Sequence, residues 1–333
     1  MIRLITRRSA DTSYLSTDKA LELDGVRDGP AEWRPTAGPG VDLANSPGRV
    51  RGYDIIFAAP RPFSILVAVG AEQEQQSAVR IHREAVQATL NYLEDRATLV
   101  RVSRDGNRWT RADTWRGVTS FTHGVNRWGE PHLHDHALVA ARTRSGRVLD
   151  PLSLRVHLGA ADAIYLASIR EGLTRTTTRN AWRSFTGAEY VSGIDEGFRM
   201  LWPGHNRDRP DKVLWSREDI LSQWRSDLRS YVSGPEVPER KERDFDAHSY
   251  QRQLEGRLRI TRRDIIEASA HAHVRGITPE HLSSVVSTTY PELSNSFGYF
   301  EAPVSRAHAL ELVRSRTRQR ERSRDSVERD RSR

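Results

Sequence analysis

Alternating histidines in one short run constrain this chain more than any other feature. The run reads His132-Leu133-His134-Asp135-His136 and continues through the apolar residues 137–140, a pattern typical of a strand that enters a core. Residues two apart in a strand share a face of the sheet, so His134 and His136 point the same way. The chain is therefore expected to present a pair of imidazoles on one face of a β-sheet.

A third histidine, His123, ends another strand-like run eleven residues before His134. The glycine, asparagine and proline residues between 124 and 131 favour a turn, so an antiparallel neighbour is the simplest pairing. Three neutral imidazoles would leave coordination positions open for a substrate oxygen, as in catalytic metal sites. His132 has the same parity, so spacing alone leaves open which three bind. We favour His123, His134 and His136, with His132 at the rim.

A carboxylate is expected to support this site. Asp54 begins the strand-like run Asp54-Ile55-Ile56-Phe57 and could accept the second N–H of a ligand imidazole, which would fix the tautomer of that ring. The alternative is a strand-edge carboxylate in contact with water.

The charge of the chain indicates a polyanionic partner. The net charge is +8, and of 52 basic residues only Lys19, Lys212 and Lys241 are lysines. Arginine forks match phosphate groups, so we expect nucleic-acid binding. Nine arginines stand in the tail at 314–333, so the part before it is only mildly basic. Candidates for stacking on unpaired bases are Trp33, Trp109, Trp128 and Trp202. Three others fall in helical patterns and are expected in the core: Trp182, Trp215 and Trp224.

Composition also excludes several classes of protein. The 333 residues contain no cysteine, so neither disulfides nor thiolate zinc sites form, and a reducing cytoplasm is expected. No apolar run approaches the ~18 residues of a membrane span. The chain has no glycine-rich loop that ends in Gly-Lys-Ser or Gly-Lys-Thr, so a P-loop motor is not expected.

The hydrophobic pattern predicts an α+β fold, with an antiparallel β-sheet palm flanked by helices and a helical C-terminal part. Strands are expected at 3–6, 51–58, 118–123 and 134–140, with a hairpin over 99–111 and a further strand pair at 188–191 and 197–202. Helices are expected at 10–23, 62–69, 77–96, 153–182, 261–274 and 279–287, with a Gly/Pro-rich loop at 24–48 and mainly helical structure after Trp215.

Several stretches follow one another in the order and spacing of a known family. They are Leu4-Ile5-Thr6-Arg7 with Ser13-Tyr14, then Asp54-Ile55-Ile56-Phe57-Ala58-Ala59-Pro60-Arg61-Pro62-Phe63-Ser64, then Phe121-Thr122-His123, Arg127 and Leu133-His134-Asp135-His136-Ala137-Leu138-Val139. Together they resemble the TrwC/TraI-type (MobF) conjugative relaxases, which are HUH single-strand DNA endonucleases. The resemblance covers roughly residues 2–202.

The resemblance implies a site and a reaction. Tyr14 would attack the scissile phosphate and form a 5′-phosphotyrosyl intermediate, with metal ligands at His123, His134 and His136 and with Asp54 orienting one of them. The metal would be Mg²⁺ or Mn²⁺, with Zn²⁺ as the alternative. Arg127 is our candidate for a phosphate clamp. The expected function is site-specific nicking and strand transfer on single-stranded DNA at an origin of transfer, in conjugation or plasmid mobilisation.

The resemblance also leaves alternatives. Leu15 follows Tyr14 and no second tyrosine precedes Tyr53, whereas members of the family often have several tyrosines close together.

We expect a helicase in trans and, as further partners, a coupling protein or accessory DNA-binding proteins. The expected domains are a relaxase catalytic domain at 1–210, a helical part at 211–313 that could clamp DNA, and a disordered arginine-rich tail at 314–333. The competing functions are a rolling-circle replication initiator, a DNA-binding relative without catalysis, and a metal hydrolase of small substrates.

Overall fold

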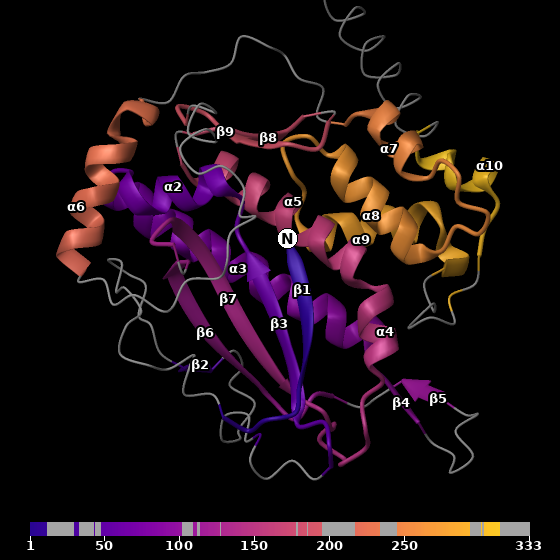
Figure 1. Ribbon diagram of the computed structural model, residues 1–333. Coiled ribbons are helices and arrows are strands. Elements are labelled where there is room, and N and C mark those ends of the chain that lie inside the picture. Colours follow the sequence, from indigo (N-terminus) through magenta and orange to yellow (C-terminus); the bar gives the residue numbers. More distant parts are fainter. Residues whose placement is uncertain are drawn as a thin grey trace, which may run out of the picture.

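A five-stranded antiparallel sheet forms the centre of the molecule (Figure 1). The computed structural model describes residues 1–11, 30–32, 43, 48–101, 109–111, 114–126, 128–177, 179–184, 186–194, 217–233, 245–293, 301 and 303–313. The order across the sheet is β1 (Ile2–Arg7), β3 (Gly52–Ala58), β7 (Pro131–Ala140), β6 (Val118–Val125) and β2 (Pro30–Glu32). The histidine-bearing strand β7 is therefore central and hydrogen-bonded on both edges.

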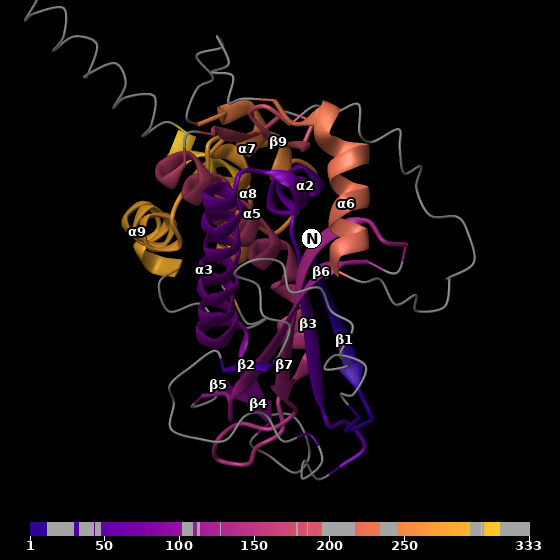
Figure 2. The ribbon, with the colours of Figure 1, turned by 90° about the vertical axis from the view of Figure 1, so that its left-hand side faces the viewer.

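Helices cover one face of this sheet (Figure 2). The long helix α3 (Glu72–Ala97) buries residues at helical spacing, among them Ile81, Ala85 and Leu93. Beside it lies α5 (Leu158–Thr176), whose Tyr165 meets Phe57 of β3 with ring centroids 5.7 Å apart. Each long helix follows a short one, α2 (Arg61–Val69) or α4 (Pro151–Val156).

The remaining helices pack in two places. The first group is α6 (Arg217–Leu228) with the 3-10 helix η2 (Arg229–Tyr231) that follows it. Three residues of α6 belong to the same hydrophobic cluster as the sheet: Ile220, Trp224 and Leu228. The others gather around α5 in a second cluster (Figure 1). They are α7 (Ala247–Gln253), α8 (Arg262–Ala272), α9 (Pro279–Thr289), η3 (Pro291–Leu293) and α10 (Arg306–Ala309).

Most of the expected elements are confirmed. The sheet strands, the hairpin of β4 (Leu99–Arg101) with β5 (Trp109–Arg111), and the helices near 62–69, 77–96, 261–274 and 279–287 are present. Trp224 is buried as expected. Within the described residues, no helix has both the length and the apolar character that crossing a membrane requires.

Three expectations are wrong, and two others concern residues that the structure does not describe. The single helix expected over 153–182 is divided at His157, whose ring binds the Tyr92 hydroxyl at 2.8 Å, and it ends at Thr176. Trp182, expected in a helix and in the core, lies instead on strand β8 (Ala181–Arg183), which pairs with β9 (Glu189–Val191), and its half-buried ring stacks on Tyr190. Residues 30–32 form an edge strand inside the expected loop. The helix at 10–23, almost entirely, and the strand at 197–202 lie outside the described residues.

Candidate metal centre

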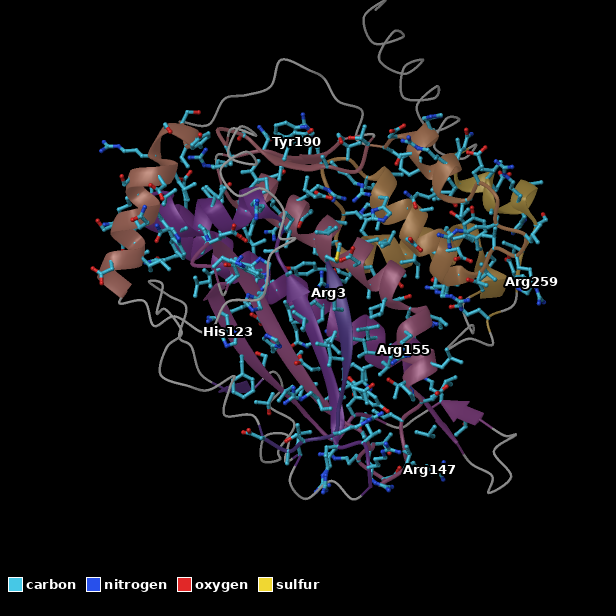
Figure 3. All side chains as sticks on the ribbon, viewed as in Figure 1. Arg3, His123, Arg147, Arg155, Tyr190 and Arg259 are labelled. Carbon is cyan, nitrogen blue, oxygen red and sulfur yellow. The ribbon has the colours of Figure 1, made fainter. Side chains whose placement is uncertain are left out.

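Three imidazoles meet on the sheet face opposite α3 and α5. His123 of β6 pairs directly with His134 of β7, and His136 follows two residues later on the same face. Their ring centroids are 5.1, 5.3 and 5.3 Å apart. One nitrogen from each ring lies within 4.8 Å of the others. Figure 3 labels His123 at this place. The structure thus brings together the three histidines selected from the sequence.

His132 lies at the edge of this cluster. Its ring centroid is 4.7 Å from that of His134, but the convergent nitrogens come from the other three rings. Nδ1 of His134 donates a hydrogen bond to the backbone carbonyl of His132 at 2.8 Å. That bond assigns Nε2 of His134 as the nitrogen for a metal ion.

Burial holds two of these imidazoles in the neutral form. Desolvation lowers the pKa of His134 well below 6.5, and the neighbouring rings of His132, His123 and His136 lower it further. The pKa of His132 falls to about 4, first through burial and then through positive charges that include Arg61 and Arg3. A metal ion binds neutral imidazole, so His134 is ready for a metal at neutral pH.

Asp54 stands behind one ring of the cluster. Nδ1 of His136 donates to the carboxylate of Asp54, at 3.0 Å from Oδ2 and 3.1 Å from Oδ1. Asp54 is only 1% exposed and lies on β3, which pairs with β7. Such a carboxylate fixes the tautomer and raises the basicity of a ligand histidine. It thereby assigns Nε2 of His136 to the metal side.

A buried glutamate, which sequence reasoning missed, holds the turn between the two histidine strands. Glu130 is 2% exposed and accepts hydrogen bonds from Asn126 Nδ2 at 2.6 Å and Arg61 Nη2 at 3.2 Å. Gly129 has φ +76°, a conformation that favours glycine. Its carbonyl accepts from the indole of Trp224 at 2.7 Å, so α6 is attached to this turn.

The opposite face of β7 contacts a histidine from the helical layer, His82 of α3. Asp135 points toward the helices, and its Oδ1 lies 3.0 Å from Nε2 of His82 on α3. Nδ1 of His82 lies 2.8 Å from the hydroxyl of Tyr165 on α5. All three side chains are fully buried. This chain of hydrogen bonds ties the histidine strand to both long helices.

Two expected site residues lie outside the part of the chain that the structure describes, and one basic residue joins the site unexpectedly. Tyr14 and Arg127 lie outside the described residues. Arg3, which sequence reasoning missed, pairs with Ile56, the neighbour of His136 across the sheet. Arg3 therefore stands on the histidine face (Figure 3), and the parity of β1 is the signal that could have found it.

An antiparallel palm with a three-histidine cluster and a supporting carboxylate defines a protein built around a metal centre. The TrwC relaxase family matches residues 4–202. A segment of 93 residues is 33% identical to the multifunctional conjugation protein TraI of Escherichia coli strain K12, and covers 28% of this chain and 5% of TraI.

Two solved structures of the conjugative relaxase TrwC share the fold. The metal-bound complex with oriT DNA has 16% identity and a TM-score of 0.52, covering 69% of this chain and 98% of that chain. The complex with a 27-mer DNA comprising the recognition hairpin and the cleavage site has 17% identity and a TM-score of 0.52, covering 70% and 99%. This chain belongs to the TrwC relaxase family.

Proposed function

We propose that this protein is a relaxase, which nicks one DNA strand at a specific site in an origin of transfer and then transfers or rejoins it. The cluster of His123, His134 and His136, with Asp54 behind His136, carries the proposal within the TrwC relaxase family. Two TrwC complexes support it, one metal-bound with oriT DNA and one with a 27-mer that comprises a recognition hairpin and the cleavage site.

The residues present fit a divalent cation. Three nitrogens converge, and hydrogen bonds assign Nε2 in two of the rings. A bound ion would polarise a non-bridging phosphate oxygen and offset the charge that develops at phosphorus. We favour Mg²⁺ or Mn²⁺, the metals that the resemblance to the family implies, with Zn²⁺, which three imidazoles also suit, as the alternative.

Tyr14 is the proposed nucleophile. Its oxygen forms a bond to phosphorus while the bond from phosphorus to O3′ breaks; the phenol loses its proton and O3′ gains one. The products are a 5′-phosphotyrosyl link and a 3′-OH, and the same exchange in reverse rejoins strands. A phenol of pKa ~10 needs a proton acceptor at neutral pH. Asp54 is buried and accepts from Nδ1 of His136 with both oxygens, so we assign it to orienting that ring rather than to taking the proton. Arg127 and Arg3 supply positive charge for the phosphate.

The helical part has a proposed role of its own. Among the helices after residue 210, α6 is the candidate for clamping DNA, because the bond from Trp224 attaches it to the turn at Gly129, whereas α7 to α10 pack around α5. The division into 1–210, 211–313 and 314–333, the helicase in trans, the coupling or accessory proteins and the cytoplasmic location stay predictions.

The test is a covalent-adduct assay. The protein is incubated, with Mn²⁺ or Mg²⁺, with labelled single strands from its own genetic element; a denaturing gel then detects adducts and peptide mapping locates them. We expect an adduct on Tyr14 that is lost in Tyr14→Phe and with EDTA. Tyr190→Phe, on β9 far from the cluster (Figure 3), is the matched control and should retain the adduct.

The other results are equally informative. Strong DNA binding with no adduct on any strand would refute catalysis and leave a DNA-binding relative. An adduct on another tyrosine would keep the class of enzyme and refute Tyr14.

A further inference from the structure

A cavity of about 430 Å³ lies between α3, α5, α8 and α9, away from the histidine cluster. These helices lie side by side on the helical side of the sheet (Figure 2), whereas the three histidines occupy the opposite face. The pocket joins α3 and α5, inside the family match at 4–202, to α8 and α9, which lie beyond it. Nothing in the nicking mechanism uses it.

A buried arginine lines this pocket without adequate partners. Arg262 is 1% exposed, and its Nε and Nη1 atoms have no hydrogen-bond partner. Its Nη2 has only a long contact, 3.4 Å, to the hydroxyl of Ser287. A buried charge that lacks partners destabilises the fold. A ligand that supplies acceptors would remove that destabilisation.

The charges around the guanidinium do not neutralise it. Glu301 lies near, but its carboxylate accepts hydrogen bonds from the backbone and guanidinium of Arg263. Asp95 pairs with Arg96 and with Arg111. Burial and the nearby charge of Arg96 lower the pKa of Arg262, although a guanidinium keeps its proton in proteins. The lining holds two arginines, Arg262 and Arg96, and two carboxylates, Asp95 and Glu280, and among these four the buried side-chain atoms without a hydrogen-bond partner belong to Arg262.

We propose that this pocket binds a phosphate monoester, carried either by a small molecule or by the 5′ end of a DNA strand. Arg262 provides the cationic donors, and the hydroxyls of Ser283, Ser284 and Ser287 provide further ones. A monoester phosphate presents three terminal oxygens, which matches such a set of donors better than the two oxygens of a carboxylate. The volume exceeds that of phosphate alone, and Ala88 and Ile164 line it for an apolar body.

The experiment measures binding by calorimetry and thermal shift in EDTA, so that the histidine centre takes no part. The probes are inorganic phosphate, deoxyadenosine 5′-monophosphate, and a short oligonucleotide with and without a 5′-phosphate. Binding of the mononucleotide alone identifies a small-molecule site. Tighter binding of the 5′-phosphorylated oligonucleotide than of its unphosphorylated form identifies a strand end. No binding of any probe overturns the proposal.

Two variants localise the binding. Arg262→Gln should weaken it at least about tenfold, whereas Arg259→Gln, the same change at an exposed arginine outside the pocket, should leave it within about twofold. Equal binding by Arg262→Gln and the wild type overturns the proposal.

Stability distinguishes a ligand site from a structural arginine. Without ligand, Arg262→Gln should melt no lower than the wild type, because an unpaired charge has been removed; a clear drop in Tm indicates a structural role and counts against the proposal. If this variant does not fold, Ser284→Trp at the exposed rim should block the pocket and abolish binding.

Discussion

The two faces of β7 hold histidine side chains in opposite circumstances. On one face, His134 and His136 converge with His123 so that one nitrogen of each ring meets the others within 4.8 Å. On the other face, both nitrogens of His82 are hydrogen-bonded, to Asp135 and Tyr165. Along this strand, His134 and His136 face a site that can accept a ligand, whereas Asp135 between them makes a contact that holds the sheet against its helices.

Removing a ring from the convergent cluster should have the largest effect. His134→Ala should lower DNA cleavage by about 10³-fold or more, because metal assistance is worth several kcal/mol in the transition state, and EDTA should do the same to the wild type. Gel assays of nicking measure the rate. The matched control is His132→Ala on the same strand, which should retain most activity. An equal loss in both variants would break the distinction between cluster and rim.

Removing the buried ring should affect stability instead. His82→Ala leaves the carboxylate of Asp135 buried without its partner, which should lower the free energy of unfolding by about 3 kcal/mol or more. Urea denaturation measures it, and Tyr165→Phe, which removes only a neutral hydroxyl, should cost about 1 to 2 kcal/mol. Nicking by the remaining folded protein should change little. A large loss of rate in a fully folded His82→Ala would show that the two faces are coupled.

The supporting carboxylate lies between these extremes. Asp54→Asn should weaken Mn²⁺ binding about 10- to 100-fold, because a supporting partner orients the ligand rather than binding the metal. Calorimetry with Mn²⁺ measures the affinity, and Asp219→Asn, on the exposed side of α6, serves as the control. Unchanged affinity in Asp54→Asn would remove Asp54 from the site.

The half-buried imidazole of His271 shows how desolvation and neighbouring positive charges together lower a histidine pKa. His271 of α8 has no hydrogen-bond partner for Nδ1, and desolvation, with nearby arginines, lowers its pKa from 6.5 to about 3. Between pH 6.5 and 3 the unfolded chain binds a proton that the folded chain does not, so this group destabilises the fold as the pH falls. The slope is at most about 1.4 kcal/mol per pH unit.

Denaturation curves from pH 7 to 5 test this, with His271→Gln for comparison. The variant should lose stability less steeply below pH 6.5 than the wild type. If the stability of the wild type and of His271→Gln fell in parallel as the pH is lowered, the pKa of His271 would be the same in the folded and the unfolded chain.

Local patterns made much of the site predictable. The period of two in residues 132–140 placed His134 and His136 on one face, and the turn residues before them placed His123 on the paired strand. Both inferences rest on interactions within about twenty residues, where strand geometry leaves few alternatives.

Long-range contacts were not predictable in the same way. Glu130 in a loop is typical of an exposed residue, and its burial depends on Arg61, 69 positions away. His82 meets Asp135 across 53 positions, and the surroundings of Arg262 come from separate helices. A single sequence does not indicate which distant elements meet. The helix expected over 153–182 was wrong for a related reason, since the contact of His157 with Tyr92 and the pairing of β8 with β9 override local helical preference.

The hydrogen bond from Trp224 to the carbonyl of Gly129 has a consequence for protein engineering. A minimal nickase shortened to the family-matched residues would lose α6 and leave that carbonyl and the surface beneath the indole open to water. A chain shortened in this way should hold the turn between the two histidine strands less firmly. Retaining residues through Leu228 keeps the indole that covers this turn.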